Sequence, residues 1–398
     1  MRASEQRRVR RGGLFRTRRH VWACAGLALA AGACAVRATA QLPAEPAGVE
    51  QLPARPGAHW VWVNDMAFFS LPDGKAFLVD GDSGKMLGML SGGYSFNALL
   101  VPRSGGVLYA PESYYSRGTR GQRTDVVTIY DASRLEPLGE IAIPPKRSSS
   151  MPMLANAALT DDERFLLIYN FTPAQSVTVV DLHERKLAAE IDTPGCALVY
   201  PTGARSFFSL CSDGSLLLTT LTDAGQAAAR AHTTPLFDAV KDPLTEKGVR
   251  AGDTWLFASF AGTIYPLRSA HGGIERGATW PLFTPAELGA HWRTGGLQHL
   301  ALHAASGRLY AIVHQGGPET HKDPGTAVWV YEVASRRRVQ QIALHGKTGS
   351  IQVSQDASPL LFACFIESST LDIYDATSGK YLRSVAGIGQ TPTVLVTP

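Results

Sequence analysis

Short apolar runs that alternate with acidic turns recur along most of this chain, and the clearest copy lies at residues 116–143. There the β-branched run 126–130 is typical of a strand that is buried on both faces. Asp131 and the residues after it turn the chain, because Asp and Ser side chains bond nearby backbone groups. A second strand follows at 138–143, and Pro144 ends it.

The same unit of strand, turn and strand recurs at intervals of about 50 residues, a spacing typical of repeat architectures. Its strong copies turn at Asp80, Asp131, Asp181, Glu332 and Asp375, and two weaker copies turn near Asp223 and Ser269. A further apolar strand precedes most copies. Four-stranded blades in a ring bury such strands and leave only short edges. The sequence therefore predicts an all-β fold, a seven-bladed β-propeller of four-stranded antiparallel blades.

A β-sandwich array is the competing architecture, but no linker rich in Pro, Gly or Ser separates one unit from the next. Helical signal is scarce, and its best candidate is a short helix at 235–247, in an insertion between blades. We expect the strand at 59–63, or the last one at 393–397, to complete a blade begun at the other terminus and so to close the ring.

The N-terminal residues predict an exported protein. A basic segment at 2–19, an apolar segment at 21–36 and Ala38-Thr39-Ala40 form a secretory signal peptide, cut after Ala40. The apolar run is too short to span a bilayer and is broken by glycines, so we expect no membrane span and a periplasmic location. We predict a signal peptide at 1–40, a flexible arm at 41–58 and the propeller at 59–398.

Removing residues 1–40 changes the charge of the protein. Nine of the 38 basic residues and one of the 34 acidic residues lie there, so the remainder carries 29 basic and 33 acidic residues, a net charge of −4. The mature chain thus lacks the excess of positive charge that is typical of nucleic-acid-binding proteins.

Three cysteines remain after the signal peptide is removed. Cys196 and Cys211 lie at the two ends of a hairpin-like segment, where they could pair or could stay as two buried thiols. Cys364 lies within the apolar strand 361–366, which favours a packed small side chain over a nucleophile.

Catalytic and metal-binding templates fit poorly. No G-x-S-x-G or H-E-x-x-H sequence occurs, and His299 and His303 lack a third ligand, so we predict no catalytic residue and no metal site in this chain. The turn at 80–84 resembles a short calcium loop, but its counterparts in other repeats are ordinary hairpin turns. Three arginines of one loop form a candidate subunit interface or anion site, although taken alone they favour bridges between blades. They are Arg117, Arg120 and Arg123.

The segment 116–125, S-R-G-T-R-G-Q-R-T-D, resembles the heavy subunit of the tryptophan tryptophylquinone-dependent amine dehydrogenases, the methylamine and aromatic amine dehydrogenases. Other stretches of the mature chain are similar to that family as well. They are Val63-Asn64-Asp65, Gly88-Met89, Pro144-Pro145-Lys146-Arg147, Gly195-Cys196, the stretch from Cys211 to Gly214, 292–296, 303–308, Thr320-His321-Lys322 and Ser354-Gln355.

This resemblance implies a fold and a function. In the family, the heavy chain is a seven-bladed propeller, and two heavy and two light chains form an α2β2 heterotetramer. The light subunit carries the tryptophan tryptophylquinone, which forms a Schiff-base adduct with a small primary amine; the products are an aldehyde and ammonia. Electrons then pass to a blue copper protein of the amicyanin or azurin type. This chain itself would bind no cofactor.

The resemblance also assigns roles to residues of this chain. An aromatic residue after a small pair lines the amine channel in the family, and here Tyr94 follows Gly92-Gly93, where relatives carry Phe. Phe96 and Asn97 are expected to share the channel wall, whereas packing of Tyr94 within its loop is the alternative. The cysteines at 196 and 211 match a pair in the family, which favours a disulfide.

Two other functions stay open at this point. A stand-alone exported propeller that binds a ligand or a protein would lack a light-chain partner and would be a monomer. A propeller enzyme with its own bound quinone and calcium is the weakest hypothesis, because no acidic cluster with suitable spacing is present.

Overall fold

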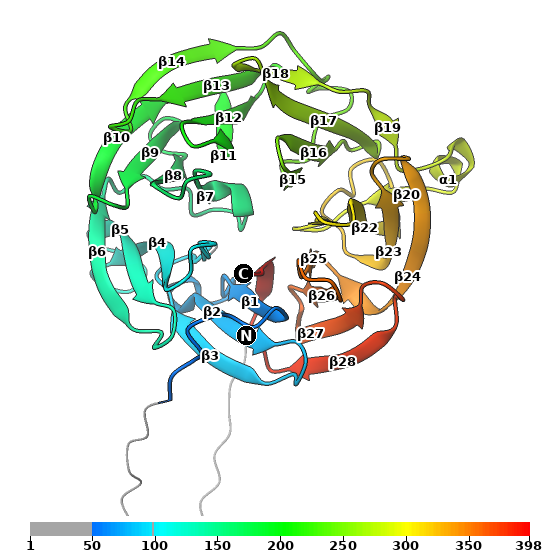
Figure 1. Cartoon of the computed structure of the whole chain (residues 1–398), viewed down its shortest axis with the longest axis horizontal. Helices are drawn as coiled ribbons and strands as arrows, with labels where there is room; N and C mark the ends of the chain where they lie inside the picture. The colour runs from blue at the N-terminus through cyan, green and yellow to red at the C-terminus, as the bar shows by residue number, and fades with distance from the viewer. Residues whose placement is uncertain (1–49, 98) are drawn as a thin grey trace, which may run out of the picture. The chain divides into compact units, whose positions relative to one another are not determined.

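The computed structural model describes residues 50–97 and 99–398, and within them seven antiparallel sheets surround a common axis (Figure 1). The all-β, seven-bladed propeller predicted from the repeat is therefore confirmed. Most blades have four strands, and the second has three with an added bridge between Leu100 and Tyr109. The predicted signal peptide and residues 41–49 of the predicted arm lie outside the described residues.

Of the first three blades in chain order, only blade 1 combines strands from both ends of the chain. Blade 1 contains β29 (Pro392–Val396), β1 (Trp60–Asp65), β2 (Lys75–Asp80) and β3 (Met86–Ser91). Blade 2 contains β4 (Val107–Tyr115), β5 (Arg123–Asp131) and β6 (Pro137–Ile143). Blade 3 contains β7 (Ala157–Leu159), β8 (Phe165–Asn170), β9 (Ser176–Asp181) and β10 (Lys186–Asp192).

The other four blades follow in order. Blade 4 contains β11 (Cys196–Gly203), β12 (Ser206–Cys211), β13 (Leu216–Leu221) and β14 (Ala227–His232). Blade 5 contains β15 (Val249–Ala251), β16 (Thr254–Ala258), β17 (Thr263–Ala270), β18 (Gly273–Arg276) and β19 (Trp280–Pro281). Blade 6 contains β20 (Trp292–Thr294), β21 (Leu300–His303), β22 (Arg308–Gln315), β23 (Gly325–Glu332) and β24 (Arg337–Thr348). Blade 7 contains β25 (Ser350–Val353), β26 (Leu360–Phe365), β27 (Ser368–Asp375) and β28 (Tyr381–Ala386).

The acidic turns of the repeat join the third and fourth strands of the blades. At Asp131 the carboxylate accepts hydrogen bonds from the backbone N–H groups of Ser133 and Arg134, and Asp375 accepts one from Ser378. These bonds replace ladder bonds that the tight turn cannot make. We call the end of the ring that carries these turns the hairpin face. The opposite end, which carries the connections 66–74, 92–97, 116–122 and 144–153, is called the loop face.

The ring closes where the last strand pairs with the first. β29 lies antiparallel to β1, and Trp62 pairs with Val396 in register, so the C-terminal strand completes the blade begun at the N-terminus. This confirms the predicted closure, although β1 begins at Trp60 and β29 spans Pro392–Val396. The carboxylate of Asp65 also stabilises this contact, because it accepts hydrogen bonds from the backbone N–H groups of Ala67, Gln390 and Thr391.

The predicted helix at 235–247 is wrong, since these residues form an irregular loop with a turn at 239–241 and an isolated bridge between Leu244 and Ser259. The carboxylate of Asp238 accepts from the N–H groups of Val240 and Lys241, which offers the backbone an alternative to helix. Pro243 lacks the N–H that a helix interior requires. The described residues hold one short α-helix, α1 (Pro285–Gly289), and two 3₁₀ turns, η1 (Leu71–Asp73) and η2 (Leu154–Asn156). α1 begins with a capping box between Thr284 and Glu287.

A histidine joins the first and last blades at the hairpin face. His59 Nδ1 lies 2.7 Å from Asp82 Oδ1, and its Nε2 lies 3.1 Å from Asp356 Oδ2 in the connection that follows β25. Burial lowers the pKa of His59, but the hydrogen bonds and charges of Asp82 and Asp356 outweigh burial and raise this pKa above 6.5. The stabilisation is therefore present below pH 6.5 and is lost as the pH rises through the folded-state pKa.

We expect the His59→Gln substitution to lower the free energy of unfolding at pH 5.5 by about 0.5 kcal/mol, a value suited to a partly exposed ion pair. At pH 8.5 the difference from the wild type should largely vanish. Urea unfolding at the two pH values measures both differences. His183→Gln is the matched control, because that side chain is 80% exposed. A difference for His59→Gln that is equal at both pH values would contradict the prediction.

Candidate functional site

The loop at 92–97 has a fixed shape at the loop face, directly after β3. Gly93 lies so close to the Ser113 carbonyl that a Cβ atom there would collide with it. Ser95 adopts a φ of 51°, in the left-handed region that non-glycine residues rarely occupy. The ring of Phe96 is buried in the core between the first two blades and anchors the loop from below. A strained loop that its surroundings hold in one conformation is typical of a functional site.

Arg147 holds this loop from the neighbouring blade. Its guanidinium donates from Nη2 to the Tyr94 carbonyl at 2.6 Å and from Nε to Ser113 Oγ at 2.8 Å. The side chain is 3% exposed, and the Ser148 carbonyl beside it accepts from the Asn97 amide at 2.8 Å. The planar guanidinium thus ties the connection at 144–153 to the loop at 92–97.

A buried carboxylate supports Arg147. Asp125, which is 1% exposed, accepts from the Arg147 backbone N–H at 3.2 Å and forms a two-bond ion pair with Arg123 at 2.7 Å. Burial lowers the pKa of the Arg147 guanidinium to about 10, although the charge of Asp125 raises it, so Arg147 stays charged at neutral pH. The site therefore contains two arginines around one carboxylate.

The side chain that this framework presents is Tyr94. Its backbone N–H donates to the Ser113 carbonyl at 2.7 Å, and its half-buried ring meets the ring of Tyr115 edge-on, with 5.0 Å between centroids. The side chains of Phe96 and Asn97, at the end of the same loop, are buried in the protein. Asn97 Oδ1 has no hydrogen-bond partner within residues 50–97 and 99–398. Of the three predicted channel residues, Tyr94 is the one that reaches the surface.

The three arginines of the candidate interface lie in different surroundings. Arg117 and Arg120 are exposed on the loop that joins β4 and β5 at the loop face. Arg123 instead turns inward to Asp125, and it also donates to the Arg147 carbonyl at 2.9 Å. The structure thus separates two surface cations from one that supports the framework of the loop.

A buried acid behind the site escaped the sequence analysis. Glu112 on β4 is fully buried and accepts hydrogen bonds from Thr128, Tyr114 and Tyr130. Burial raises the pKa of Glu112, and these three bonds lower it only in part. The available signal was a Glu in the middle of an apolar strand with two tyrosines nearby. Because protein donors reach both of its oxygens, the group supports β4 and β5 from within the blade.

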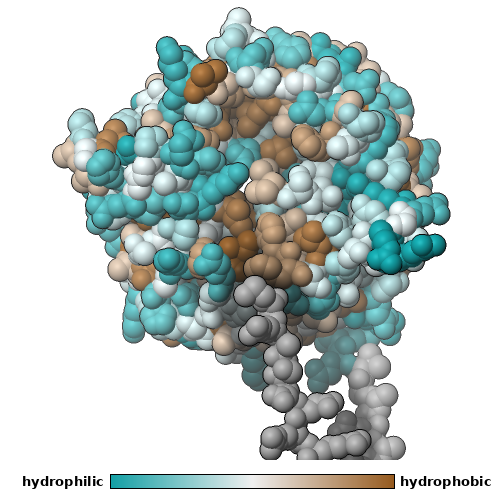
Figure 2. All heavy atoms as spheres, turned by 180° about the vertical axis from the view of Figure 1, so that it is seen from behind, coloured by the Kyte–Doolittle hydropathy of each residue, from teal (hydrophilic) through white to brown (hydrophobic). Residues whose placement is uncertain are grey.

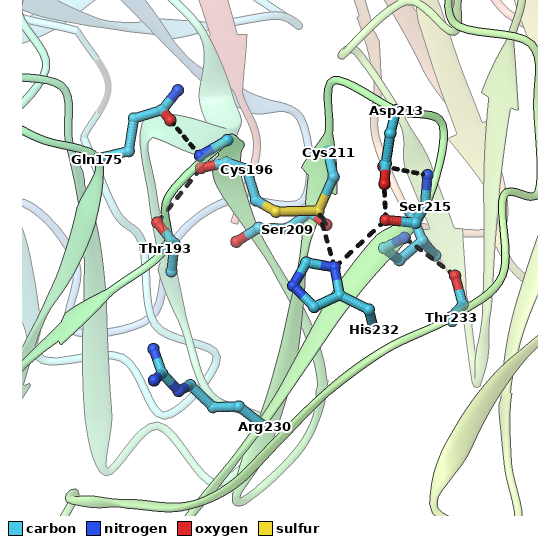
Figure 3. The surroundings of a disulfide bond; sticks show 12 residues. Gln175, Thr193, Cys196, Ser209, Cys211, Asp213, Ser215, Arg230, His232 and Thr233 are labelled. Carbon is cyan, nitrogen blue, oxygen red and sulfur yellow. Dashed lines mark hydrogen bonds between the residues drawn. A yellow bond between two sulfur atoms is a disulfide. The ribbon is translucent and has the colours of Figure 1, made fainter.

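Cys196 and Cys211 form a disulfide between directly opposite positions of β11 and β12 (Figure 3). His232 from β14 points toward this bond, with Nδ1 3.9 Å from Cys211 Sγ and 3.3 Å from Ser215 Oγ. The bridge spans 15 residues, a loop for which chain entropy gives about 3 kcal/mol of stability. Cys364 is buried in β26, and burial raises the pKa of its thiol to about 12, which is typical of an inert packed thiol.

A central cavity of about 630 Å³ lies among the innermost strands. Its walls carry apolar groups such as Met153, Leu154 and Trp255. Its charged lining residues are Arg103, Glu246, Lys247 and Arg250. Figure 2 shows hydrophobic residues gathered toward the middle of one face of the ring. The cavity is large enough for a small organic molecule.

Several large apolar side chains are exposed on the loop face of the first three blades. They are Phe68 (37% exposed), Phe69 (91%), Tyr114 (40%) and Phe171 (54%). Phe69 lies on the connection between β1 and β2, and Phe171 lies on the one between β8 and β9. Exposed aromatic groups of this size are typical of protein interfaces. Within the part of the chain that the structure describes, no helix has the length and apolar character needed to cross a bilayer.

The family model and the sequence relatives agree on one family. The family model "Methylamine dehydrogenase heavy chain (MADH)" matches residues 57–398. The methylamine dehydrogenase heavy chain of Methylophilus methylotrophus is 32% identical over 339 residues, which cover 84% of this chain and 82% of that protein. The heavy chain of Paracoccus versutus is 32% identical over 347 residues, which cover 86% and 80%. Among solved structures, the periplasmic gluconolactonase PpgL of Pseudomonas aeruginosa has a TM-score of 0.60 at 16% identity, covering 85% of this chain and 98% of that chain, a likeness of fold alone.

Proposed function

The chain belongs to the methylamine dehydrogenase heavy-chain family, and from this membership we propose that it is the heavy subunit of a periplasmic amine dehydrogenase. In this proposal the enzyme converts a primary amine to an aldehyde and ammonia. The tryptophan tryptophylquinone is carried by a separate light subunit, and a blue copper protein accepts the electrons. When bound through the light subunit, the quinone supplies the redox chemistry, and this chain supplies the walls around it.

The observation that carries the proposal is the match of the family model over residues 57–398, which includes every blade. The relatives are 32% identical over more than four fifths of this chain. Likeness of fold alone does not indicate a function. A sequence match that extends around the whole ring, in contrast, supports a role shared with these relatives.

We place the contact with the light subunit at the loop face of the first three blades. Tyr94 reaches the surface there on a loop that Arg147 holds, and exposed aromatic groups such as Phe69 lie on the same face. In the proposed complex the Tyr94 ring narrows the path of the amine. Phe96 and Asn97 fix the loop from below, since both are buried. Arg117 and Arg120 are free to meet acidic groups of the partner.

Expression with and without a light subunit tests the proposal. A tagged chain purified from its native host should bring along a small, cysteine-rich protein in equal amount, and the complex should show quinone absorbance and amine-dependent dye reduction. The same chain expressed alone should show neither. The proposal fails if the isolated chain oxidises amines, or if the chain from the native host elutes as a monomer at micromolar concentration without a companion.

A stand-alone binding propeller is the second candidate. The central cavity favours it, because the cavity belongs to this chain and needs no partner subunit. A monomer from the native host that binds a small molecule would support this second function. The two candidates therefore give opposite results in the purification described above.

A further inference from the structure

Three buried nitrogen atoms from two adjacent blades have no hydrogen-bond partner among the described residues, and one of these residues, Lys247, lines the central cavity. They are Lys247 Nζ, His299 Nδ1 and His321 Nδ1. Lys247 precedes β15, His299 precedes β21, and His321 lies in the connection between β22 and β23, so two adjacent blades contribute. The imidazole of His299 bonds Thr245 Oγ1 through Nε2 at 3.1 Å, and His321 stacks on Phe260 at 3.8 Å between centroids. Their positions are thus fixed by packing.

Lys247 has an ion-pair partner in this cluster but no hydrogen-bond acceptor among the described residues. Lys247 is 7% exposed, and its closest carboxylate oxygen belongs to Glu246, at 3.9 Å. Burial lowers the pKa of Lys247, and the nearby charge of Lys322 lowers it further, while Glu246 raises it. Burial likewise lowers the pKa of His321, with further lowering by Lys247. A buried ammonium without an acceptor is costly, so an anion at this point would relieve both the repulsion and the missing bond.

The cavity beside Lys247 is apolar over much of its wall. Met153, Leu154 and Trp255 line it, and the amides of Gln298 and Gln355 are already engaged with backbone groups. The indole N–H of Trp255 is also satisfied, by the Pro201 carbonyl at 2.9 Å. A ligand would therefore find a partly apolar cavity of about 630 Å³ whose wall includes Lys247, an ion-paired cation without a hydrogen-bond acceptor among the described residues.

We propose that the central cavity binds a small organic carboxylate with an apolar body. The carboxylate accepts a hydrogen bond from Lys247 Nζ, and the apolar body lies against Leu154 and Trp255. This site does not depend on the proposed enzyme function, because all of its residues belong to this chain. The described residues offer no comparable metal site. The one cluster of metal-ligating residue types among them is Cys196, Cys211 and His232, and its two sulfur atoms are joined in the disulfide.

Titration calorimetry of the purified full-length chain tests the site, with hexanoate as the probe. We expect one hexanoate per chain, and hexanamide, which has the same shape without the charge, should bind about tenfold or more weakly. Inorganic phosphate should also bind weakly, because it lacks the apolar body. Hexanoate binding no stronger than hexanamide binding, or no hexanoate binding at 10-millimolar concentrations, would overturn the proposal. The comparison of these probes needs no variant, so it stands even if a variant fails to fold.

Two substitutions locate the site within the cavity. Lys247→Met should weaken hexanoate binding by about tenfold or more while leaving hexanamide binding unchanged. Lys380→Met at the hairpin face is the matched control, since it removes a lysine from an exposed turn between β27 and β28. Unchanged hexanoate affinity in a folded Lys247→Met protein would exclude Lys247 as the anchor and would overturn the inference. The two proposals can be tested separately. If the chain has no light subunit but Lys247→Met loses hexanoate binding, the proposed function is wrong and the cavity site is still supported.

Discussion

The Arg147→Met substitution should lower the free energy of unfolding by about 4 kcal/mol, the usual cost of removing one member of a buried charged network. Met fills the space of the side chain, but the Tyr94 carbonyl loses the Arg147 donor, and Ser113 Oγ keeps only its bond to Asp125 and a long bond from Arg123. The part-buried Tyr94 carbonyl is then left without its donor, and such a group costs free energy of desolvation. Urea unfolding followed by tryptophan fluorescence measures the change.

In the proposed complex with a light subunit, the same substitution should also lower amine oxidation. The loop at 92–97 would lose the bond that holds the Tyr94 carbonyl, so the Tyr94 ring would no longer keep one position. We expect kcat/KM for the amine to fall about tenfold in the folded variant, because small displacements of positioning groups are costly. Tyr94→Ala should produce a similar loss without the large loss of stability.

Arg147→Lys separates charge from geometry at this position. Lysine keeps the positive charge near Asp125 but cannot donate to Tyr94 and Ser113 in one plane. An intermediate loss of stability is expected, with the catalytic effect nearly as large as in Arg147→Met. Wild-type stability in Arg147→Met, or full activity with a disordered loop, would show that Arg147 does not position Tyr94.

The repeat of apolar strands and acidic turns was sufficient to predict the ring. Each turn acid that the sequence marks, such as Asp131 and Asp375, lies at a hairpin between the outer two strands of a blade. These positions are readable because a hairpin turn depends on residues close in sequence. The closure between β1 and β29 was also predictable, since a repeat that begins with an incomplete blade needs a strand from the other end.

The surroundings of the candidate site were much harder to predict. Arg147 and Tyr94 are 53 residues apart, and nothing in either segment signals that one holds the other. Likewise, Lys247 and His321 come from separate connections that meet only because the blades curve around one axis. Arg123 illustrates the same limit: its loop neighbours Arg117 and Arg120 are exposed, whereas Arg123 turns inward to a buried Asp125. Contacts between blades depend on the geometry of the ring, which a local pattern does not contain.

The helix prediction at 235–247 failed for a related reason. Its composition is compatible with helix, but the Asp238 side chain captures the N–H groups of Val240 and Lys241. Such local capture depends on the side-chain conformation that the surrounding blades permit. In contrast, Thr284 and Glu287 mark the start of α1 through a capping box, a signal that the sequence analysis overlooked.

Removing the carboxylate of Asp65 should weaken the closure of the ring by about 4 kcal/mol, as expected when several buried N–H groups lose a charged acceptor together. Asp65 is 1% exposed and accepts from Ala67, Gln390 and Thr391, which lie before and after the joined strands. Asp65→Ala leaves these three N–H groups without an acceptor. Because β1 and β29 come from opposite ends of the chain, the loss falls on the contact that prevents the ring from opening.

Two further variants show whether the effect belongs to ring closure. Gly389 has a φ of 71°, and a Cβ there would collide with the Asp65 carboxylate, so Gly389→Ala should destabilise the same contact. Asp375→Ala removes a turn carboxylate within a single blade and should cost much less than Asp65→Ala, since no second end of the chain depends on it. Hydrogen exchange should show the amides of β29 losing protection first in both closure variants. Equal costs for Asp65→Ala and Asp375→Ala would mean that Asp65 is an ordinary turn residue and that the ladder alone closes the ring.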